Sequence, residues 1–170
     1  MSRFAVREAK LGDAEAIARA HTLSWQTSYR GILPDNVLDR IDVGQRADSR
    51  RRILRDGKIL TLVAYDLTHG DIVGMCDAGP TRRYAPFGGE IYALYLVQHA
   101  KMHGLGREML ERCQAWFAAK DKRSMIIWVL ENNLHARRFY EAIGGQLGAS
   151  FRSSVGGFPV TEVSYVWERF

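Results

Sequence analysis

The chain has few of the residues that mark a disulfide-linked, metal-binding or membrane protein. Its 170 residues include only four prolines and two cysteines, Cys76 and Cys113, which lack the spacing of a metal site. Its apolar runs are short and interrupted, so no membrane-spanning segment is expected. The charged N-terminus lacks the long apolar core of a secretion signal. These absences predict a protein of the reducing cytoplasm with no metal and no membrane partner.

Apolar and basic residues are abundant instead. An apolar content of 46% predicts one domain, residues 1–170, with a substantial core. The net charge is +5, and five arginines cluster in one segment: Arg46, Arg50, Arg51, Arg52 and Arg55. Nucleic-acid-binding surfaces contain such clusters, but no aromatic or glycine-rich RNA-binding signature accompanies this one. We therefore expect a solvated helix face and no nucleic-acid partner.

The most informative segment is an apolar run followed by a glycine-containing loop and an amphipathic helix. Residues 91–97 are apolar or aromatic, Gly104 and Gly106 follow, and apolar residues then recur at helical spacing. A strand, a glycine loop and a helix start together place free backbone N–H groups at one point, where phosphate binds. A dinucleotide fold is excluded because Met109 stands where its third glycine belongs. A P-loop is excluded because no Lys-Ser/Thr follows Gly106.

A second segment has the pattern of a strand followed by a capped helix. Apolar residues 125–130 precede Asn133, a preferred helix N-cap, and two glycines end the pattern at 144–145. Asn133, Ala136 and Tyr140 are three and seven residues apart, so they share one helix face.

At these two segments the chain resembles the GNAT superfamily of N-acetyltransferases. Residues 101–106, Lys-Met-His-Gly-Leu-Gly, look like the (Gln/Arg)-x-x-Gly-x-(Gly/Ala) pyrophosphate loop, and residues 133–140 look like the Asn-x-x-Ala-x-x-x-Tyr helix. The order of elements fits over nearly the whole chain. The resemblance implies an α/β fold with a mixed, mostly antiparallel central sheet of about seven strands flanked by helices on both faces. It also implies acetyl-CoA as the cofactor.

The resemblance assigns the cofactor contacts residue by residue. Loop N–H groups are expected to hold the pyrophosphate. The end of the preceding strand is expected to pair with the pantetheine arm and to polarise the thioester oxygen through free N–H groups. Two positions depart from the family pattern: Lys101 replaces Gln or Arg, and Gly145 replaces Phe. The expected cofactor-binding residues are Leu96, Val97, Lys101, Met102, His103, Gly104, Leu105, Gly106, Arg107, Asn133, Ala136 and Tyr140.

Three residues are candidates for proton transfer. Tyr140 matches the family tyrosine that protonates the departing thiolate, and a phenol with a reference pKa near 10 suits that donation. Glu90 opens the cofactor strand, where relatives carry a glutamate that takes the proton of the amine. An exposed strand-end charge is the alternative for Glu90, and Glu131 is a second candidate base. Neither motif contains a cysteine, which favours direct attack in a ternary complex over a covalent acyl-enzyme.

Three aromatic residues are candidates for the acceptor site. Trp25 and Tyr29 belong to a Trp-x-x-x-Tyr-Arg-Gly-Ile-Leu-Pro segment that covers the acceptor in similar proteins, with ordinary core as the alternative, and Tyr92 is expected in the same cleft. Residues 79–89 have the glycines and prolines of a movable lid. The favoured reaction is acetyl transfer to a primary amine, with a small molecule favoured over a protein. A non-catalytic acyl-CoA sensor or docking module, an RNA-associated protein and a homodimer through the last strand remain open.

Periodicity predicts the other elements. Strands are expected at 4–8, 58–65, 72–78, 91–97, 125–130, 146–152 and 158–168. Helices are expected after residues 12–13, near 36–41, through the arginine cluster, and after each of the two motifs. In the last strand residues 163, 165 and 167 alternate with 164, 166 and 168.

Overall fold

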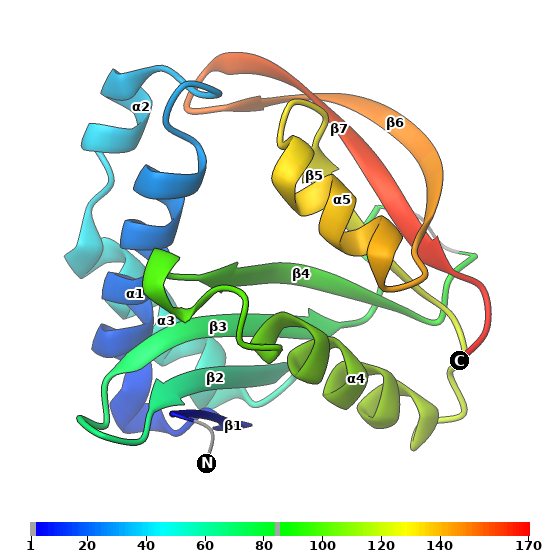
Figure 1. The fold of residues 1–170 in the computed structure, drawn as a ribbon, viewed down its shortest axis with the longest axis horizontal. Coiled ribbons are helices and arrows are strands. Elements are labelled where there is room, and N and C mark those ends of the chain that lie inside the picture. Colours follow the sequence, from blue (N-terminus) through cyan, green and yellow to red (C-terminus); the bar gives the residue numbers. More distant parts are fainter. Residues whose placement is uncertain (1–2, 84–85) are drawn as a thin grey trace.

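A computed structural model describes residues 3–83 and 86–170, which form a seven-stranded sheet with helices on both faces (Figure 1). The strands are β1 (Phe4–Glu8), β2 (Leu60–Asp66), β3 (Ile72–Gly79), β4 (Gly89–Leu96), β5 (Met125–Leu130), β6 (Gln146–Val155) and β7 (Phe158–Trp167). The helices are α1 (Ala14–Ser28), α2 (Asp35–Asp39), α3 (Val43–Asp56), α4 (Leu105–Ala118) and α5 (Leu134–Ala142), with 3-10 turns at Leu11–Asp13 and Gln98–Ala100. The predicted fold class is confirmed.

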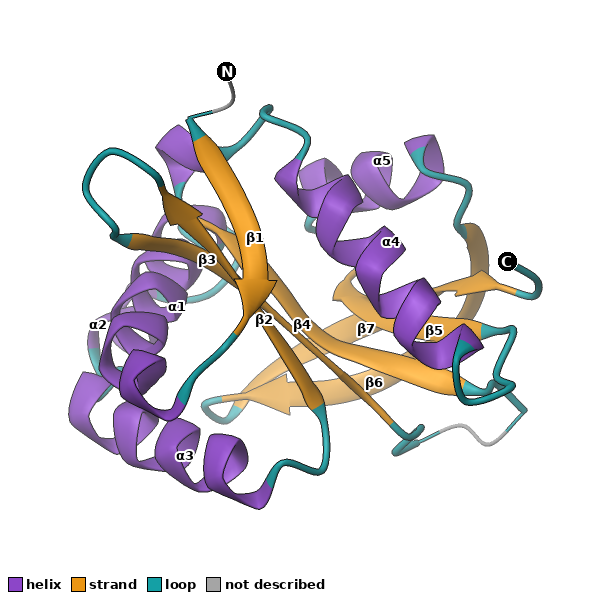
Figure 2. Cartoon of the chain, turned by 90° about the horizontal axis from the view of Figure 1, so that it is seen from below, coloured by secondary structure: helices purple, strands orange, loops and turns teal. Residues whose placement is uncertain are grey.

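The strand order is β1-β2-β3-β4-β5-β7-β6, and every neighbouring pair is antiparallel except β4 and β5. Helices α4 and α5 cover one face of the sheet, and α1, α2 and α3 cover the other (Figure 2). A parallel neighbour requires a crossover connection, and α4 supplies it between β4 and β5. The cofactor motif therefore lies on the one parallel connection between neighbouring described strands.

The two central strands separate after a short contact. In the described register β4 and β5 pair only from Gly89 to Ile91 and from Met125 to Ile127. A register shift against β3 lies beside this point, because Ile91 pairs with Ala78 and Ala93 with Asp77, which leaves Tyr92 as the extra residue. A bulge of this kind bends a strand. Beyond it, the edge of β4 that faces β5 is open.

Apolar side chains fill both sides of the sheet. The α4 side holds the larger core, which contains Met109, Cys113 and Phe117 of α4 together with Tyr140 of α5. On the α1 side, Ile17 packs against Val63 and Met75. Each amphipathic helix therefore buries its apolar stripe against the sheet, and the sequence periodicity predicted this for α1 and α4.

Most predicted elements lie within two residues of the observed ones. The second helix spans Asp35–Asp39 instead of 36–41, and β6 continues to Val155 instead of ending at residue 152. The predicted loop corresponds to the connection between Gly79 and Gly89, of which residues 84 and 85 lie outside the described part of the chain. Its predicted movement as a lid stays a prediction.

The four residues of β7 that were expected to form a dimer contact are buried within the chain, and a homodimer itself stays a prediction. β7 lies inside the sheet between β5 and β6, and its second half is covered on both faces. Val163, Tyr165, Val166 and Trp167 are all buried, as is Ser164. A strand buried on both faces has no alternating exposed side. The strand at this edge of the sheet is β6.

The arginine cluster is only partly solvated, in contrast to the prediction. Arg52 and Arg55 of α3 are exposed, but Arg50 is buried with its guanidinium 2.5 Å from the Asp77 carboxylate of β3. The same carboxylate accepts a hydrogen bond from Thr61. Arg46 stacks over the Trp25 ring at 4.8 Å. These arginines attach α3 to the sheet and to α1, because buried charges require partners.

Candidate functional site

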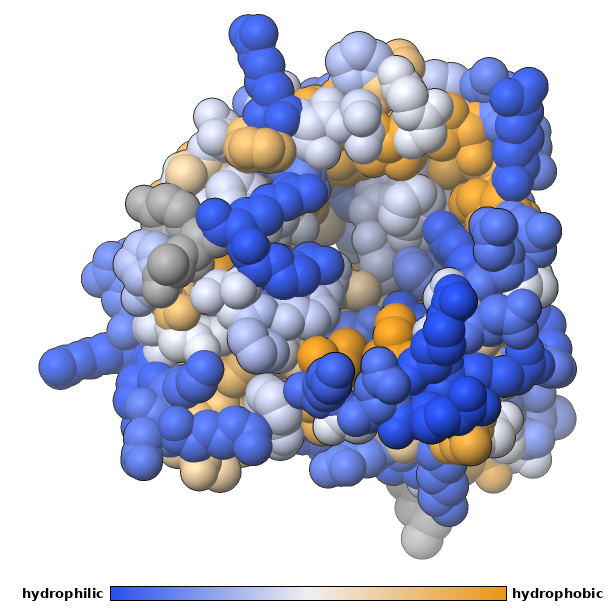
Figure 3. All heavy atoms as spheres, turned by 180° about the vertical axis from the view of Figure 1, so that it is seen from behind, coloured by the Kyte–Doolittle hydropathy of each residue, from blue (hydrophilic) through white to orange (hydrophobic). Residues whose placement is uncertain are grey.

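A cleft of about 870 Å³ opens where β4 and β5 part. Its lining comes from both faces of the sheet: Trp25 and Tyr29 from the α1 side, and Gly104 and Tyr140 from the α4–α5 side. Figure 3, viewed from the side opposite to Figure 1, shows the surface hollowed near its middle, with hydrophilic side chains along the rim. The cleft therefore joins the predicted cofactor residues to the predicted acceptor residues.

The start of α4 has unsatisfied backbone donors. No side chain caps this helix, and the N–H groups of residues 102–107 have no acceptor in the described part of the chain. Uncapped donors and the positive end of the helix dipole together favour an anion. The loop N–H groups assigned to the pyrophosphate are thus available at the mouth of the cleft.

The two glycines of this loop have different roles. Gly104 has a φ of 79°, a conformation that L side chains rarely adopt, and the position where its Cβ would lie is open. A Cβ on Gly106 would lie 2.9 Å from the Phe139 ring of α5. Gly104 therefore shapes the loop. Gly106 is explained by the close approach of α4 to α5.

The other loop residues are divided between the cleft and the surface. Lys101 lines the cleft, and its Nζ lies 3.3 Å from Ser28 Oγ at the end of α1. Partial burial lowers the pKa of Lys101. Met102 is exposed and lines the cleft, whereas His103 is exposed outside it, with its ring edge-on to Phe4. Arg107 is exposed and lines the cleft. Lys101 is therefore placed to offer a cation beside the free N–H groups.

The end of β4 corrects one cofactor assignment. Val97 N–H donates to Val73, and the Val97 carbonyl accepts from Ala100. Both backbone groups of Val97 are therefore occupied, so it offers no free N–H to a thioester. In an antiparallel ladder the N–H direction alternates, so Leu96 N–H points away from β3 and toward the open side. Leu96 keeps its predicted role, and the sequence could not reveal which of the two residues had the free group.

The second motif is a capped helix, as predicted. Asn133 Oδ1 accepts a hydrogen bond from Ala136 N–H at 3.2 Å, and both residues line the cleft. Tyr140 is buried, and its ring lies 5.8 Å from that of Tyr165. In the described part of the chain the Tyr140 hydroxyl has no hydrogen-bond partner. Burial, with smaller contributions from Tyr95 and Cys76, raises the pKa of Tyr140 well above its usual value. The phenol therefore stays protonated.

The missing side chain at Gly145 is compensated by a tryptophan. A Cβ on Gly145 would lie 2.8 Å from the Trp167 ring, and Trp167 Nε1 donates to Ile143 O. The indole of β7 thus fills the space beside the residue where relatives carry Phe. The departure affects packing and leaves the Tyr140 helix in place.

Glu90 is buried, and Arg82 occupies both of its oxygens. Arg82 backbone N–H donates to Oε2 at 2.8 Å, and its guanidinium donates to Oε1 at 2.8 Å. The guanidinium also lies 3.9 Å from the Tyr92 ring centroid, and the Tyr92 hydroxyl donates to Pro80 O. The alternative of an exposed strand-end charge is therefore wrong. Glu131, the second candidate base, is exposed and does not line the cleft.

Two of the three predicted acceptor aromatics, Trp25 and Tyr29, form a cluster with Tyr95 beside the cleft, whereas Tyr92 lines the cleft next to Arg82. Tyr29 is buried, and its hydroxyl lies 3.1 Å from that of Tyr95. Trp25 packs edge-on to Tyr29, with ring centroids 5.1 Å apart. Burial raises the pKa of both tyrosines. Trp25 and Tyr29 thus pack in the core and also line the cleft.

Sequence reasoning missed a charged pair at the acceptor side. Glu162 of β7 and Arg83 line the cleft, with Arg83 Nη1 2.5 Å from Glu162 Oε2. No motif contains either residue. The one available signal was a glutamate inside a mostly apolar strand, which is unusual unless the side chain has a partner.

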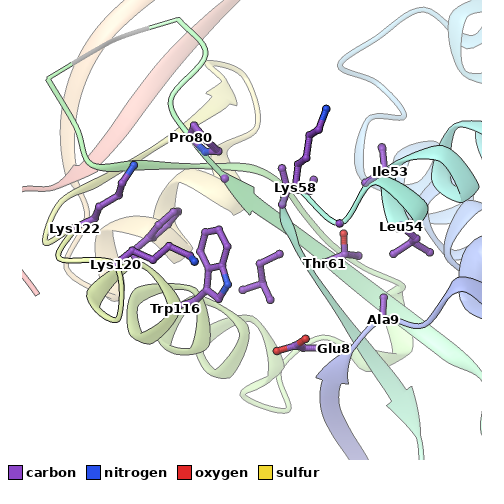
Figure 4. A pocket seen from close by; sticks show the side chains of 15 residues that line it. Glu8, Ala9, Ile53, Leu54, Lys58, Thr61, Pro80, Trp116, Lys120 and Lys122 are labelled. Carbon is purple, nitrogen blue, oxygen red and sulfur yellow. The ribbon is translucent and has the colours of Figure 1, made fainter.

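A second hollow of about 530 Å³ lies at the other end of α4 (Figure 4). Trp116, Lys120 and Lys122 line it from this side, and Ile53 and Leu54 line it from α3. Lys120 stacks on the Trp116 ring at 4.6 Å. Lysine beside the C-terminal end of a helix is favoured by the helix dipole, so its charge has a structural explanation here.

The described residues contain neither a metal-site cluster nor a membrane-spanning helix. No group of His, Cys, Asp and Glu there has the arrangement of a metal site. No helix among residues 3–83 and 86–170 has the length and apolar character needed to cross a membrane.

Comparisons with known proteins agree with this geometry. Residues 18–145 match the family described as acetyltransferase (GNAT). The chain is 31% identical over 163 residues to an uncharacterized N-acetyltransferase, YuaI, of Bacillus subtilis (strain 168), covering 95% of this chain and 91% of that protein.

Two solved structures share the fold. PaiA N-acetyltransferase of Thermoplasma acidophilum in complex with coenzyme A superposes with a TM-score of 0.73 at 16% identity, covering 98% of this chain and 99% of that one. YncA of Salmonella typhimurium, a putative acetyltransferase with its cofactor acetyl-CoA, gives 0.71 at 19% identity, covering 98% and 94%.

Proposed function

Because the chain belongs to the acetyltransferase (GNAT) family, we propose that it transfers the acetyl group of acetyl-CoA to a primary amine. The favoured acceptor is a small molecule, attacked directly in a ternary complex. The observation that carries this proposal is the cleft between β4 and β5, with an uncapped helix start at one end and the buried Glu90 carboxylate at the other. A reducing, cytoplasmic location is part of the proposal, and the two free cysteines support it.

The residues present fit the cofactor. The N–H groups of residues 103–107 would hold the pyrophosphate, with the Lys101 ammonium beside them. The open edge of β4, including Leu96 N–H, would pair with the pantetheine arm and polarise the thioester oxygen. Asn133 and Ala136 line the same side. When bound, the cofactor supplies an activated acetyl group.

The proton transfers are assigned to two residues. The amine nitrogen forms a bond to the acetyl carbon as the carbon–sulfur bond breaks, and the sulfur leaves as a thiolate. Tyr140, protonated and without a partner, would donate its proton to that sulfur and regain one from solvent. Glu90 would accept the proton that the amine loses, directly or through water, and it lines the cleft from the start of β4. Trp25, Tyr29 and Tyr92 would bound the acceptor.

Thermal shift and thiol release with acetyl-CoA across a panel of amines test the proposal. We expect acetyl-CoA to raise the melting temperature and thiol release to require an amine. Binding without turnover on any amine would contradict the transferase proposal and favour an acyl-CoA sensor. Absence of binding would contradict the assignment of the loop itself.

A further inference from the structure

The acceptor side of the cleft contains an ion pair to which the proposed transfer assigns no role. Arg83 Nη1 lies 2.5 Å from Glu162 Oε2, and the Glu162 side chain is only 18% exposed. Glu162 pairs with Leu130 of β5 on one side and with Phe151 of β6 on the other. It therefore lies beyond the point where β4 and β5 part, and its carboxylate belongs to the cleft.

The strand register fixes the face on which this pair lies. Side chains directly opposite each other in an antiparallel pair point to the same face, so Glu162, Leu130 and Phe151 share one. Leu130 packs against Tyr29 and Leu33, which places this face on the α1 side. The charge of Glu162 also contributes to the raised pKa of Tyr29. Glu162 therefore points toward the acceptor side, away from α4 and α5.

We propose that Arg83 and Glu162 bind an acceptor that carries its amine and an anionic group a few atoms apart, as an amino acid does. The ammonium pairs with Glu162 and the anionic group with Arg83, so the internal ion pair is exchanged for two pairs with the ligand. The inference rests on the proposed acetyl transfer, because it concerns the acceptor of that reaction.

Simple amines and polyamines fit this arrangement less well. An amine without an anionic group pairs with the Glu162 carboxylate and leaves the Arg83 guanidinium without its partner. A polyamine brings a second positive charge toward Arg82 and Arg83, which both line the cleft. An acceptor with adjacent opposite charges satisfies both residues and adds no net charge.

The surroundings of the pair indicate the rest of the acceptor. Arg83 stacks over the Phe151 ring at 5.1 Å, and the Trp128 ring lies 6.3 Å from Phe151. Trp128 lines the cleft, and its buried Nε1 has no hydrogen-bond partner in the described residues. The Trp128 ring, which lines the cleft, favours an apolar or aromatic side chain on the acceptor.

Calorimetry on the CoA-loaded protein tests binding without relying on turnover. The ligands are the standard amino acids and the amines formed by decarboxylating the apolar and aromatic ones. We expect at least one apolar or aromatic amino acid to bind about tenfold or more tighter than its decarboxylated amine, a modest factor because Arg83 is partly solvated. Equal affinities, or no amino-acid binding, would overturn the inference.

A kinetic comparison uses Arg83→Gln, Glu162→Gln and Arg19→Gln, an exposed arginine of α1 that also pairs with a glutamate. Arg83→Gln should lower kcat/KM for the amino acid about tenfold and leave that for the decarboxylated amine within about twofold. Glu162→Gln should lower kcat/KM for both substrates, and Arg19→Gln should change it for neither. Equal losses for both substrates in Arg83→Gln would mean a structural role and would overturn the inference.

The two proposals fail differently. If an amino acid binds with the expected preference but no thiol is released, acetyl transfer fails and the binding site stands. If amines are acetylated without preference for an anionic group, transfer stands and this inference fails.

Discussion

At the scale of single residues, the proposed acid, Tyr140, and the proposed base, Glu90, differ in their hydrogen-bond partners. Tyr140 is buried, has no hydrogen-bond partner in the described residues and keeps its proton, because burial disfavours the phenolate. Glu90 is also buried, but Arg82 occupies both of its oxygens. The two groups therefore make different predictions.

Replacement of Tyr140 by Phe should lower kcat about a hundredfold and change KM for acetyl-CoA little, because only proton donation to the thiolate is lost. Steady-state thiol release measures both constants. Tyr165→Phe is the matched control, since it removes a neighbouring buried hydroxyl that bonds to Arg137 and Glu141. Equal losses in the two variants would assign Tyr140 to packing.

Replacement of Glu90 by Gln should reduce kcat/KM about tenfold or more at neutral pH and progressively less at high pH. The reason is that an amine deprotonates without help once the pH passes its own pKa. A pH profile of wild type, Glu90→Gln and Glu131→Gln provides the measurement. A loss of equal size at every pH, or no loss, would remove Glu90 from the role of base.

A third residue links pH to stability. The His21 ring stacks on Tyr95, its Nε2 has no partner in the described residues, and burial together with the charges of Arg46 and Arg50 lowers the pKa of His21 to about 3. The unfolded chain, with a pKa of about 6.5, binds a proton there that the folded chain excludes. The free energy of unfolding should therefore fall as pH drops from about 6.5 toward 3, by up to about 1.4 kcal/mol per pH unit.

Denaturant unfolding at several pH values measures this slope. His21→Phe keeps the aromatic stack and should flatten the slope between pH 6 and pH 4. His135→Gln, a change at an exposed histidine, should leave it unchanged. The same slope in His21→Phe as in wild type would mean that other groups cause the acid dependence.

At the scale of elements, the site depends on how closely α4 and α5 approach. α4 presents the free N–H groups and α5 carries Tyr140, and the two helices meet where Gly106 faces the Phe139 ring. The absence of a side chain at Gly106 therefore positions the cofactor loop relative to the acid.

Gly106→Ala should destabilise the fold by about 1–3 kcal/mol, because its Cβ would lie 2.9 Å from Phe139. Phe139→Leu in the same chain should recover part of that loss. Denaturant unfolding of the single and double variants gives the coupling energy. Gly12→Ala, where a Cβ meets nothing within 4 Å, is the control. Strict additivity of the two changes would contradict a direct contact.

At the scale of the whole molecule, the sheet consists of two parts joined by a short parallel contact. β1–β4 form one part and β5–β7 the other, and the cleft lies where they separate. On the α1 side, the buried pair of Arg50 and Asp77 attaches α3 to the first part. The packing of α3, which also contacts Trp25 of the cleft wall through Arg46, therefore depends on this charge pair.

Arg50→Met should destabilise the protein by about 3 kcal/mol or more, since it leaves the Asp77 carboxylate buried without its cation. The double change Arg50→Met with Asp77→Asn should recover much of the loss, because the amide oxygen still accepts from Thr61 and no charge remains. Thermal and denaturant unfolding test this, with the exposed Arg52→Met as control. A double variant no more stable than Arg50→Met would contradict the explanation.

The sequence by itself determined the elements and the phosphate loop. Apolar periodicity is a local property, so it located β5 at residues 125–130 and the helix after Gly104 without tertiary information. The Asn133 cap and the shared face of Asn133, Ala136 and Tyr140 follow from helix geometry alone.

Only the tertiary structure decided which groups are free and which are paired. Val97 N–H bonds to β3, Arg50 reaches Asp77 across 27 residues, and Glu162 meets Arg83 across 79. Sequence spacing carries no information about such partners, because strand register and packing set them. The charged residues of the acceptor side could not be predicted from the sequence for the same reason, because they come from segments that meet only where β4 and β5 part.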